Sequence, residues 1–337
     1  MSRISFGVWA VMALILVPLA GAQSYTITDL GALPGDSLSV PYAMNNEGAV
    51  VGFSEPQGSN NRHAFLWTQT GGMRDLGTLA GDSTSIAYGI NDSGEVVGYS
   101  SSTDASHAFT WTASGGMQEL VSSAGSSWAM AINESGEVVG AYSPNGELDT
   151  HAFLWTKAQG VRDLGSLGGS SSAWAINASG EVVGYSYTMP NERTVHGFRW
   201  TEAGGMQDLG VLSGGVDSLA FAINESGEIF GVSNTSRRGD DQAAFWTESG
   251  GWHSLGLGSD SSIRAVNGSG ELVGCSLYGV RALLWTSENH GQLLDELIPP
   301  NSGWLLFAGY AINKSGQIAA YGTIDGAAHA ALLTPTN

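Results

Sequence analysis

The chain has 337 residues, with 49 glycines, one cysteine, 31 acidic and 12 basic residues, and a formal net charge of −19. This charge argues against nucleic acid or an anionic membrane surface as a partner, because a phosphate-binding surface needs the opposite sign. A single cysteine excludes a disulfide framework and any site built from several cysteines. The 42% hydrophobic content allows a large core, and the many glycines with few charges predict short strands joined by tight turns.

The N-terminal segment has the layout of a secretory signal peptide. Arg3 precedes an apolar stretch that runs to about Ala20, and residues 20–22 read Ala-Gly-Ala, a small-residue cleavage site. We expect residues 1–22 to be removed and residues 23–337 to form one domain, which is secreted or periplasmic and has no stable membrane insertion. The alternative is a retained anchor, because the apolar stretch is nearly long enough to span a bilayer.

One phrase, Ala-Ile-Asn-x-Ser-Gly-Glu-Val-Val-Gly, recurs along the chain. Its asparagine falls at seven positions, spaced 42 to 47 residues apart: Asn45, Asn91, Asn133, Asn177, Asn224, Asn267 and Asn313. Two further phrases, His-Ala-Phe-Leu-Trp-Thr and Gly-Gly-Met-x-Asp-Leu-Gly, keep step with it. Self-similarity at such a period indicates a repeat architecture.

Each repeat reads as four short strands. The first ends in Ala-Ile-Asn, the second is Glu-Val-Val-Gly-Tyr-Ser, and in the first repeat the third and fourth fall at 63–68 and 72–77. The Asn-x-Ser-Gly connection between the first two strands matches a type I turn followed by a glycine with positive φ. Four strands in each of seven repeats predict an all-β, seven-bladed β-propeller of four-stranded antiparallel blades.

The ends of the chain favour a closed ring over the alternative, an open β-solenoid. A fourth-strand phrase at 25–31 precedes the first repeat, and the seventh repeat stops after its third strand at 329–334. We therefore expect the N-terminal strand to pair with residues 329–334, complete the last blade and close the ring.

Three sets of repeated side chains have structural explanations. The tryptophan of the third strand is expected in each blade core. The histidine at the start of that strand is expected to hydrogen-bond a neighbouring strand or turn, because blade symmetry keeps these rings too far apart to share a metal. A large residue three positions before each asparagine is expected to wedge between blades near the axis: Tyr42, Tyr88, Met130, Trp174, Phe221, Arg264 and Tyr310.

The variable connections, from second to third strands and from fourth strands to the next repeat, share one face, where we expect any ligand. Its candidate residues are acidic: Asp36, Asp82, Asp149, Glu192, Asp217, Asp240, Asp241 and Asp260. Clustered carboxylates could bind Ca²⁺, but no Asp-x-Asp-x-Asp-Gly loop is present, so solvated carboxylates and no cofactor or metal are expected. Recognised nucleophile, zinc, phosphate-loop and dinucleotide motifs are also missing, and we assign no catalytic residues.

The combined phrases resemble the HAF repeat family of extracellular bacterial proteins, and His-Ala-Phe itself stands at 63–65, 107–109 and 151–153. The resemblance covers Tyr25 to Thr334 and implies secretion and a repeat fold, but it supplies no catalytic residues. We expect a monomeric, secreted, non-catalytic binding or surface-interaction module with a saccharide or an extracellular protein as ligand. The alternatives are a polysaccharide hydrolase or lyase on the same scaffold, and a purely structural envelope protein.

Overall fold

The computed structural model describes residues 24–122, 124–144, 149–189, 194–236, 241–259, 261–276, 281–286 and 291–336. These ranges form 28 strands and one 3-10 helix, η1 (Leu294–Glu296), and they contain no α-helix. None of their helices is long and apolar enough to cross a membrane. The expected signal peptide, residues 1–22, lies outside the described ranges.

Five sheets have four antiparallel strands each, and their strand order follows the chain. The first comprises β6 (Thr84–Ile90), β7 (Val96–Ser101), β8 (Ser106–Thr112) and β9 (Gly116–Glu119). The next two comprise β10 (Ala124–Ile132), β11 (Val138–Pro144), β12 (His151–Thr156) and β13 (Gly160–Asp163), then β14 (Ser171–Ile176), β15 (Val182–Tyr187), β16 (Val195–Thr201) and β17 (Gly205–Asp208). The last two comprise β18 (Ser218–Ile223), β19 (Ile229–Asn234), β20 (Asp241–Thr247) and β21 (Gly251–Ser259), then β22 (Ser262–Val266), β23 (Leu272–Ser276), β24 (Arg281–Trp285) and β25 (Gln292–Leu293).

The first and last repeats share one eight-stranded sheet. Its strands are β2 (Leu38–Met44), β3 (Val50–Glu55), β4 (His63–Thr68) and β5 (Gly72–Asp75), together with β26 (Trp304–Ile312), β27 (Ile318–Ile324), β28 (Ala327–Thr336) and β1 (Ser24–Asp29). A single parallel residue pair, Leu38 with Ala328, joins the two groups of four. Seven separate four-stranded sheets were predicted, and the structure has five. The remaining eight strands form one sheet, because Leu38 at the start of β2 pairs with Ala328 in β28.

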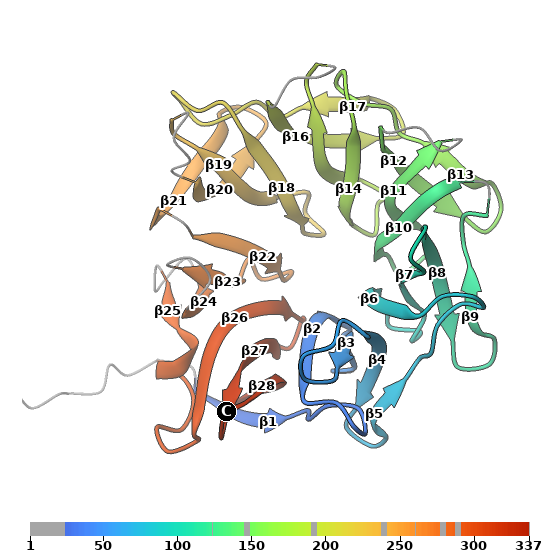
Figure 1. Cartoon of the computed structure of the whole chain (residues 1–337). Coiled ribbons are helices and arrows are strands. Elements are labelled where there is room, and N and C mark those ends of the chain that lie inside the picture. Colours follow the sequence, from blue (N-terminus) through green and yellow to red (C-terminus); the bar gives the residue numbers. More distant parts are fainter. Residues whose placement is uncertain are drawn as a thin grey trace, which may run out of the picture.

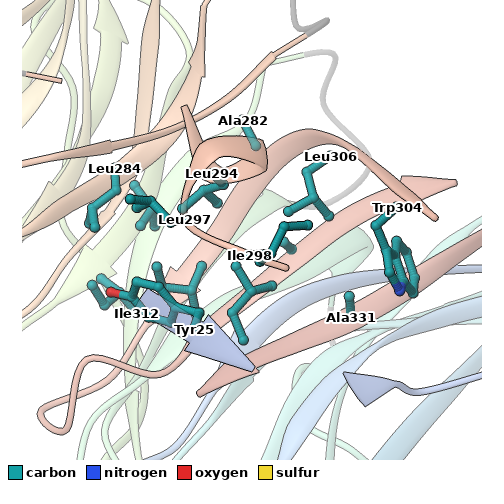
Figure 2. Packing of buried hydrophobic residues seen from close by; sticks show 14 residues of the cluster. Tyr25, Ala282, Leu284, Leu294, Leu297, Ile298, Trp304, Leu306, Ile312 and Ala331 are labelled. Atoms are coloured by element: carbon teal, nitrogen blue, oxygen red, sulfur yellow. The ribbon is translucent and has the colours of Figure 1, made fainter. Parts of the chain in front are cut away.

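The two ends of the described chain pair as predicted. Strand β1 runs antiparallel to β28, from Ser24 opposite Thr336 to Asp29 opposite Ala331 (Figure 1). Tyr25 is only 1% exposed, and its backbone N–H donates to the Leu297 carbonyl at 2.8 Å. Its side chain joins a hydrophobic cluster beside η1 (Figure 2), so β1 is an integral strand of the core.

The repeated turns explain why the strands begin and end where they do. After β6, Gly94 has a φ of +78° and its N–H donates to the Asn91 carbonyl at 3.0 Å. The Asn91 N–H donates in turn to the Glu95 carbonyl at 3.1 Å, which closes the hairpin. Glycine adopts this left-handed conformation without the steric cost that other residues carry. The same two backbone bonds recur at all seven asparagines.

Buried serines connect most repeats to the next; the seventh repeat has Phe307 at the serine position. The Ala64 N–H in β4 donates to Ser85 Oγ in β6 at 2.8 Å, and that hydroxyl donates to the Gly77 carbonyl at 2.6 Å. The bond from a third strand to the next first strand recurs along the chain as Ala108–Ser127, Ala152–Ser171, Gly197–Ser218 and Ala330–Ser39. The last of these joins the end of the chain to its beginning. Four of the six repeated tryptophans are buried, as predicted: Trp67, Trp111, Trp200 and Trp246. The other two, Trp155 and Trp285, are half-buried.

Candidate functional site

A β-bulge interrupts the first strand of every repeat. In β6, Ala87 pairs with Gly98 and Gly89 pairs with Val97, so Tyr88 has no partner in β7. A bulge of this kind leaves one residue outside the ladder and redirects its side chain. The residues skipped in this way are Tyr42, Tyr88, Met130, Trp174, Phe221, Arg264 and Tyr310.

The glycine of each Val-Val-Gly phrase lies against this bulge. A Cβ atom added at Gly98 would lie 2.0 Å from the Ile86 carbonyl oxygen. At the equivalent glycines of five other repeats the same distance is 1.9 to 2.0 Å: Gly52, Gly140, Gly184, Gly231 and Gly274. In these six repeats such close backbone approach leaves room only for glycine. The seventh repeat has Ala320 at this position, paired with Gly309, and its first strand has a second register shift between Leu306 and Ala308.

The seven bulged residues line one cavity of about 340 Å³. Figure 1 shows the first strands of the repeats toward the middle of the molecule, where this cavity lies. Ser262 and Ile263, at the start of β22, complete its lining and place it toward the face of the variable loops. The prediction that the large residues lie near the axis is confirmed; they contact the equivalent residues of adjacent repeats, as Trp174 contacts Phe221, and together they face one cavity. The bulge is the reason, because it turns each side chain off the strand edge.

Two smaller cavities continue along the axis toward the Asn-x-Ser-Gly turns. One of 260 Å³ shares the bulged residues and adds those that follow them, including Met44 and Ile90. The next, of 140 Å³, is lined by turn residues that include Asn267 and Lys314. We call the cavity of about 340 Å³ the upper cavity. The bulged residues lie between it and the apolar part of the channel, and they line both.

Aromatic contacts organise the wall of the upper cavity. Trp174 and Phe221 stack with ring centroids 4.9 Å apart and planes 10° from parallel. Tyr42 lies between Tyr88 and Tyr310, with centroid separations of 4.5 and 5.5 Å. Burial raises the pKa of both Tyr42 and Tyr88 above its ordinary value of 10.0, so these phenols are neutral at physiological pH.

Arg264 is the one cation of the cavity lining. Its guanidinium lies 4.4 Å from the centroid of the Tyr310 ring, in a cation–π arrangement. The side chain is exposed to the cavity, and it forms no ion pair with any residue that the structure describes. The wall thus combines flat apolar faces, neutral hydroxyls and one unpaired positive charge.

A chain of asparagine amides holds the wall in place. The Asn45 Nδ2 donates to the Asn91 carbonyl at 3.2 Å, and Asn91 donates to the Asn133 carbonyl at 3.4 Å. The bond recurs from Asn133, Asn177, Asn267 and Asn313, and the last of these donates to the Asn45 carbonyl at 3.3 Å. Each asparagine Oδ1 also accepts the N–H of the residue four positions ahead, as between Asn91 and Glu95 at 3.0 Å. These side chains are 2 to 6% exposed, which explains why asparagine recurs at this position.

The five predicted acidic residues that the structure describes do not belong to the cavity lining. The other three, Glu192, Asp240 and Asp260, lie outside the described residues. The Asp82 carboxylate is 2% exposed and bonds His107 Nδ1 at 3.0 Å. Asp217 accepts the Val195 N–H at 3.0 Å, Asp149 accepts the Ser170 hydroxyl at 2.8 Å, and Asp36 and Asp241 are half-buried and exposed, respectively.

The histidines bond locally, as predicted. In four repeats the Nδ1 atom lies 2.6 to 3.0 Å from a fourth-strand aspartate oxygen: His63–Asp75, His151–Asp163, His196–Asp208 and His329–Asp29. His107 uses Asp82 because its own fourth strand has Glu119 at the equivalent position. Within the described ranges, no group of three or more histidine, cysteine or acidic side chains could hold a metal ion.

Comparison with protein-family models and with curated proteins found no match. Solved structures do match the fold. A streptogramin B lyase has a TM-score of 0.60 at 11% identity, over 93% of this chain and 98% of that one. Virginiamycin B lyase from Staphylococcus aureus has a TM-score of 0.57 at 13% identity, over 92% and 99%. The β-propeller domain of the Trilobed protease from Pyrococcus furiosus has 0.56 at 9%, over 93% and 94%. At these identities the likeness shows the fold alone, and the chain has an all-β, β-propeller fold.

Proposed function

We propose that the protein is a non-catalytic binding module that holds a saccharide in the upper cavity of its channel. One observation carries this proposal: seven bulges direct six large apolar or aromatic side chains and one arginine into the same space. Ligand pockets commonly have volumes of roughly 300–1,000 Å³ and combine aromatic walls with a few polar groups. The cavity of about 340 Å³ meets both criteria.

The chemistry of the lining favours binding over catalysis. Its nine residues provide three phenols, a hydroxyl, a guanidinium and apolar side chains, and none of them is a carboxylate or an imidazole. A glycoside hydrolase typically needs two carboxylates beside the scissile bond. The likeness to two lyases supports a shared scaffold, and the polysaccharide lyase or hydrolase is the alternative that an activity assay must test.

We further propose seven blades, with the two halves of the eight-stranded sheet as the first and last. Each half contains four strands, its own bulge and its own asparagine turn, and the single pair Leu38–Ala328 is their only ladder contact among the described residues. Export rests on the apolar segment before Ala22. Membership of the HAF repeat family rests on the repeated phrases, and we propose a monomer that acts outside the cytoplasm.

A glycan array with the chain 23–337 tests the proposal, followed by calorimetric titration of each hit. Trp174→Ala removes one face of the stacked pair and should weaken binding about tenfold, because an aromatic contact contributes on the order of 1 kcal/mol. Leu305→Ala is the matched control, since that side chain is 60% exposed and lies outside the cavity lining. Absence of any glycan binding, or cleavage of a polymer in the same panel, would overturn the proposal.

A further inference from the structure

We propose that the cavity selects an acidic saccharide, whose carboxylate binds Arg264 while its sugar ring packs on Phe221 and Trp174. This inference rests on the proposed function and names the substrate class of the same site. It predicts that uronates bind more tightly than neutral sugars of the same shape.

The first argument is the unpaired charge. The chain has 31 acidic and only 12 basic residues, so a carboxylate partner is the ordinary fate of an arginine here. Four of the six described arginines do have one: Arg62 with Glu55, Arg162 with Glu202, Arg199 with Glu181, and Arg281 with Asp295. Arg74 has no ion pair among the described residues and lies over the Trp111 ring. Arg264 instead faces a cavity whose lining contains no carboxylate. A guanidinium without a carboxylate partner among the described residues can form a two-pronged bond with a ligand carboxylate.

The second argument is the orientation of Arg264. Its guanidinium lies 4.4 Å from the Tyr310 ring centroid, and this contact restrains a side chain that would otherwise be flexible. Stacking uses the flat face of the group and leaves the N–H donors at its edge available. The neighbouring Tyr42 phenol is neutral, because burial raises its pKa, so it adds no negative charge that would repel an anion.

The third argument is the arrangement around the wall. Arg264 follows Phe221 in the order of the repeats, and Phe221 stacks on Trp174 at 4.9 Å. The cavity therefore has this aromatic surface in the repeats before Arg264 and the Tyr310 ring, over which the guanidinium lies, in the repeat after it. A pyranose ring presents an apolar face suited to that surface and carries a uronic carboxylate at its rim. A neutral sugar would use the aromatic surface alone.

Isothermal titration with oligouronates tests the inference. The probes are trimers derived from pectate, alginate and hyaluronan, each compared with its methyl ester, which keeps the ring and removes the charge. The wild-type chain should bind at least one acid about tenfold more tightly than its ester, and the preference should shrink as salt screens the exposed charge.

Arg264→Met is the informative variant, because Met130 shows that the same position of another repeat holds methionine. It should lose the preference for the acid and keep its affinity for the ester. Arg74→Met is the matched control: Arg74 also lies over an aromatic ring, that of Trp111, but is absent from the cavity lining. Equal binding of acid and ester by the wild type, or an unchanged preference in Arg264→Met, overturns the inference and leaves saccharide binding intact. If no glycan on the array binds, the proposed function fails as well.

Discussion

The pairing of bulge and glycine makes a sharp prediction for Gly98→Ala. The added Cβ would lie 2.0 Å from the Ile86 carbonyl oxygen and 2.9 Å from two further backbone atoms. Non-bonded contacts of a Cβ below 3.0 Å are essentially never observed, so β6 and β7 must separate locally by about 1 Å. The obstacle is backbone in the middle of a sheet, and no side-chain rotation can relieve it.

The magnitude follows from this geometry. Overpacking of a core commonly costs about 1–3 kcal/mol, and the larger values arise where backbone has to move. Opening the bulge would also disturb the ladder between Ala87 and Gly98. We therefore expect Gly98→Ala to lower the free energy of unfolding by about 3 kcal/mol or more.

Two other glycines separate this effect from the general consequences of adding a methyl group. Gly268→Ala has no atom within 4 Å of the new Cβ and no positive φ, so its stability should change little or rise slightly. Gly94→Ala also has open space but a φ of +78°, and it should lose about 1–2 kcal/mol from backbone strain alone. Urea unfolding followed by tryptophan fluorescence ranks the three variants. The explanation is refuted if Gly98→Ala is as stable as Gly268→Ala.

Three further predictions concern the frame of the channel. Asn91→Ala removes a buried donor to the Asn133 carbonyl and an acceptor for the Glu95 N–H. It should lower the free energy of unfolding by about 2 kcal/mol, and an unchanged urea midpoint would contradict this. Burial raises the pKa of Tyr42 and Tyr88 in the folded state, so the unfolded chain releases these protons first. Stability should hold below about pH 10 and fall above it, less steeply in Tyr88→Phe; an unaltered pH profile would count against the burial argument. Deleting residues 24–30 exposes the edge of β28 and should cause self-association in size-exclusion chromatography, whereas a stable monomer would show that β1 is dispensable.

The sequence predicts strands, turns and closure well because these depend on local patterns. The Asn-x-Ser-Gly phrase encodes its hairpin within a few residues, and the bond from Gly94 N–H to the Asn91 carbonyl is its direct product. The phrase at 25–31 has the sequence of a fourth strand, and the seventh repeat lacks one, so the sequence predicts that this segment pairs with β28. The sheet count differs by one contact, Leu38 with Ala328, and no repeat pattern encodes that contact.

The cavity is harder to predict because a bulge shifts the alternation of a strand by one residue. In Ile86-Ala87-Tyr88-Gly89-Ile90 a regular strand would place the tyrosine on the same sheet face as the two isoleucines. Without a partner in β7, it turns toward the channel instead. The available signal was the glycine at 98, which lies in the middle of a valine-rich strand. An isolated glycine in a strand often marks a bulge or close approach of backbone.

Acidic loop residues were a weaker guide for a related reason: charge alone does not distinguish a ligand site from a structural partner. Asp82 supplies His107 with the carboxylate that Glu119 does not provide, so a side chain predicted for ligand binding lies buried within the fold. A residue that departs from the repeat pattern should be compared with other departures in the same repeat before a function is assigned to it. Glu119 replaces the aspartate of other repeats, and Asp82 supplies the carboxylate for His107 in its place. Arg264 has no such carboxylate partner among the described residues.

This contrast explains how one scaffold can combine a fixed frame with a variable site. Asparagine and serine form bonds between strands and repeats, and glycine permits the close backbone approach at the bulge. The asparagine is present in all seven repeats, whereas the seventh has Phe307 and Ala320 at the serine and glycine positions. The bulged residue has no partner in the neighbouring strand, so its size and charge do not affect the pairing of the two strands. Tyrosine, tryptophan, phenylalanine, methionine and arginine all occupy it in this chain, at the same register shift. Under the proposed function, the seven bulges would therefore set the ligand chemistry of the channel one residue at a time, without a change in the fold around them.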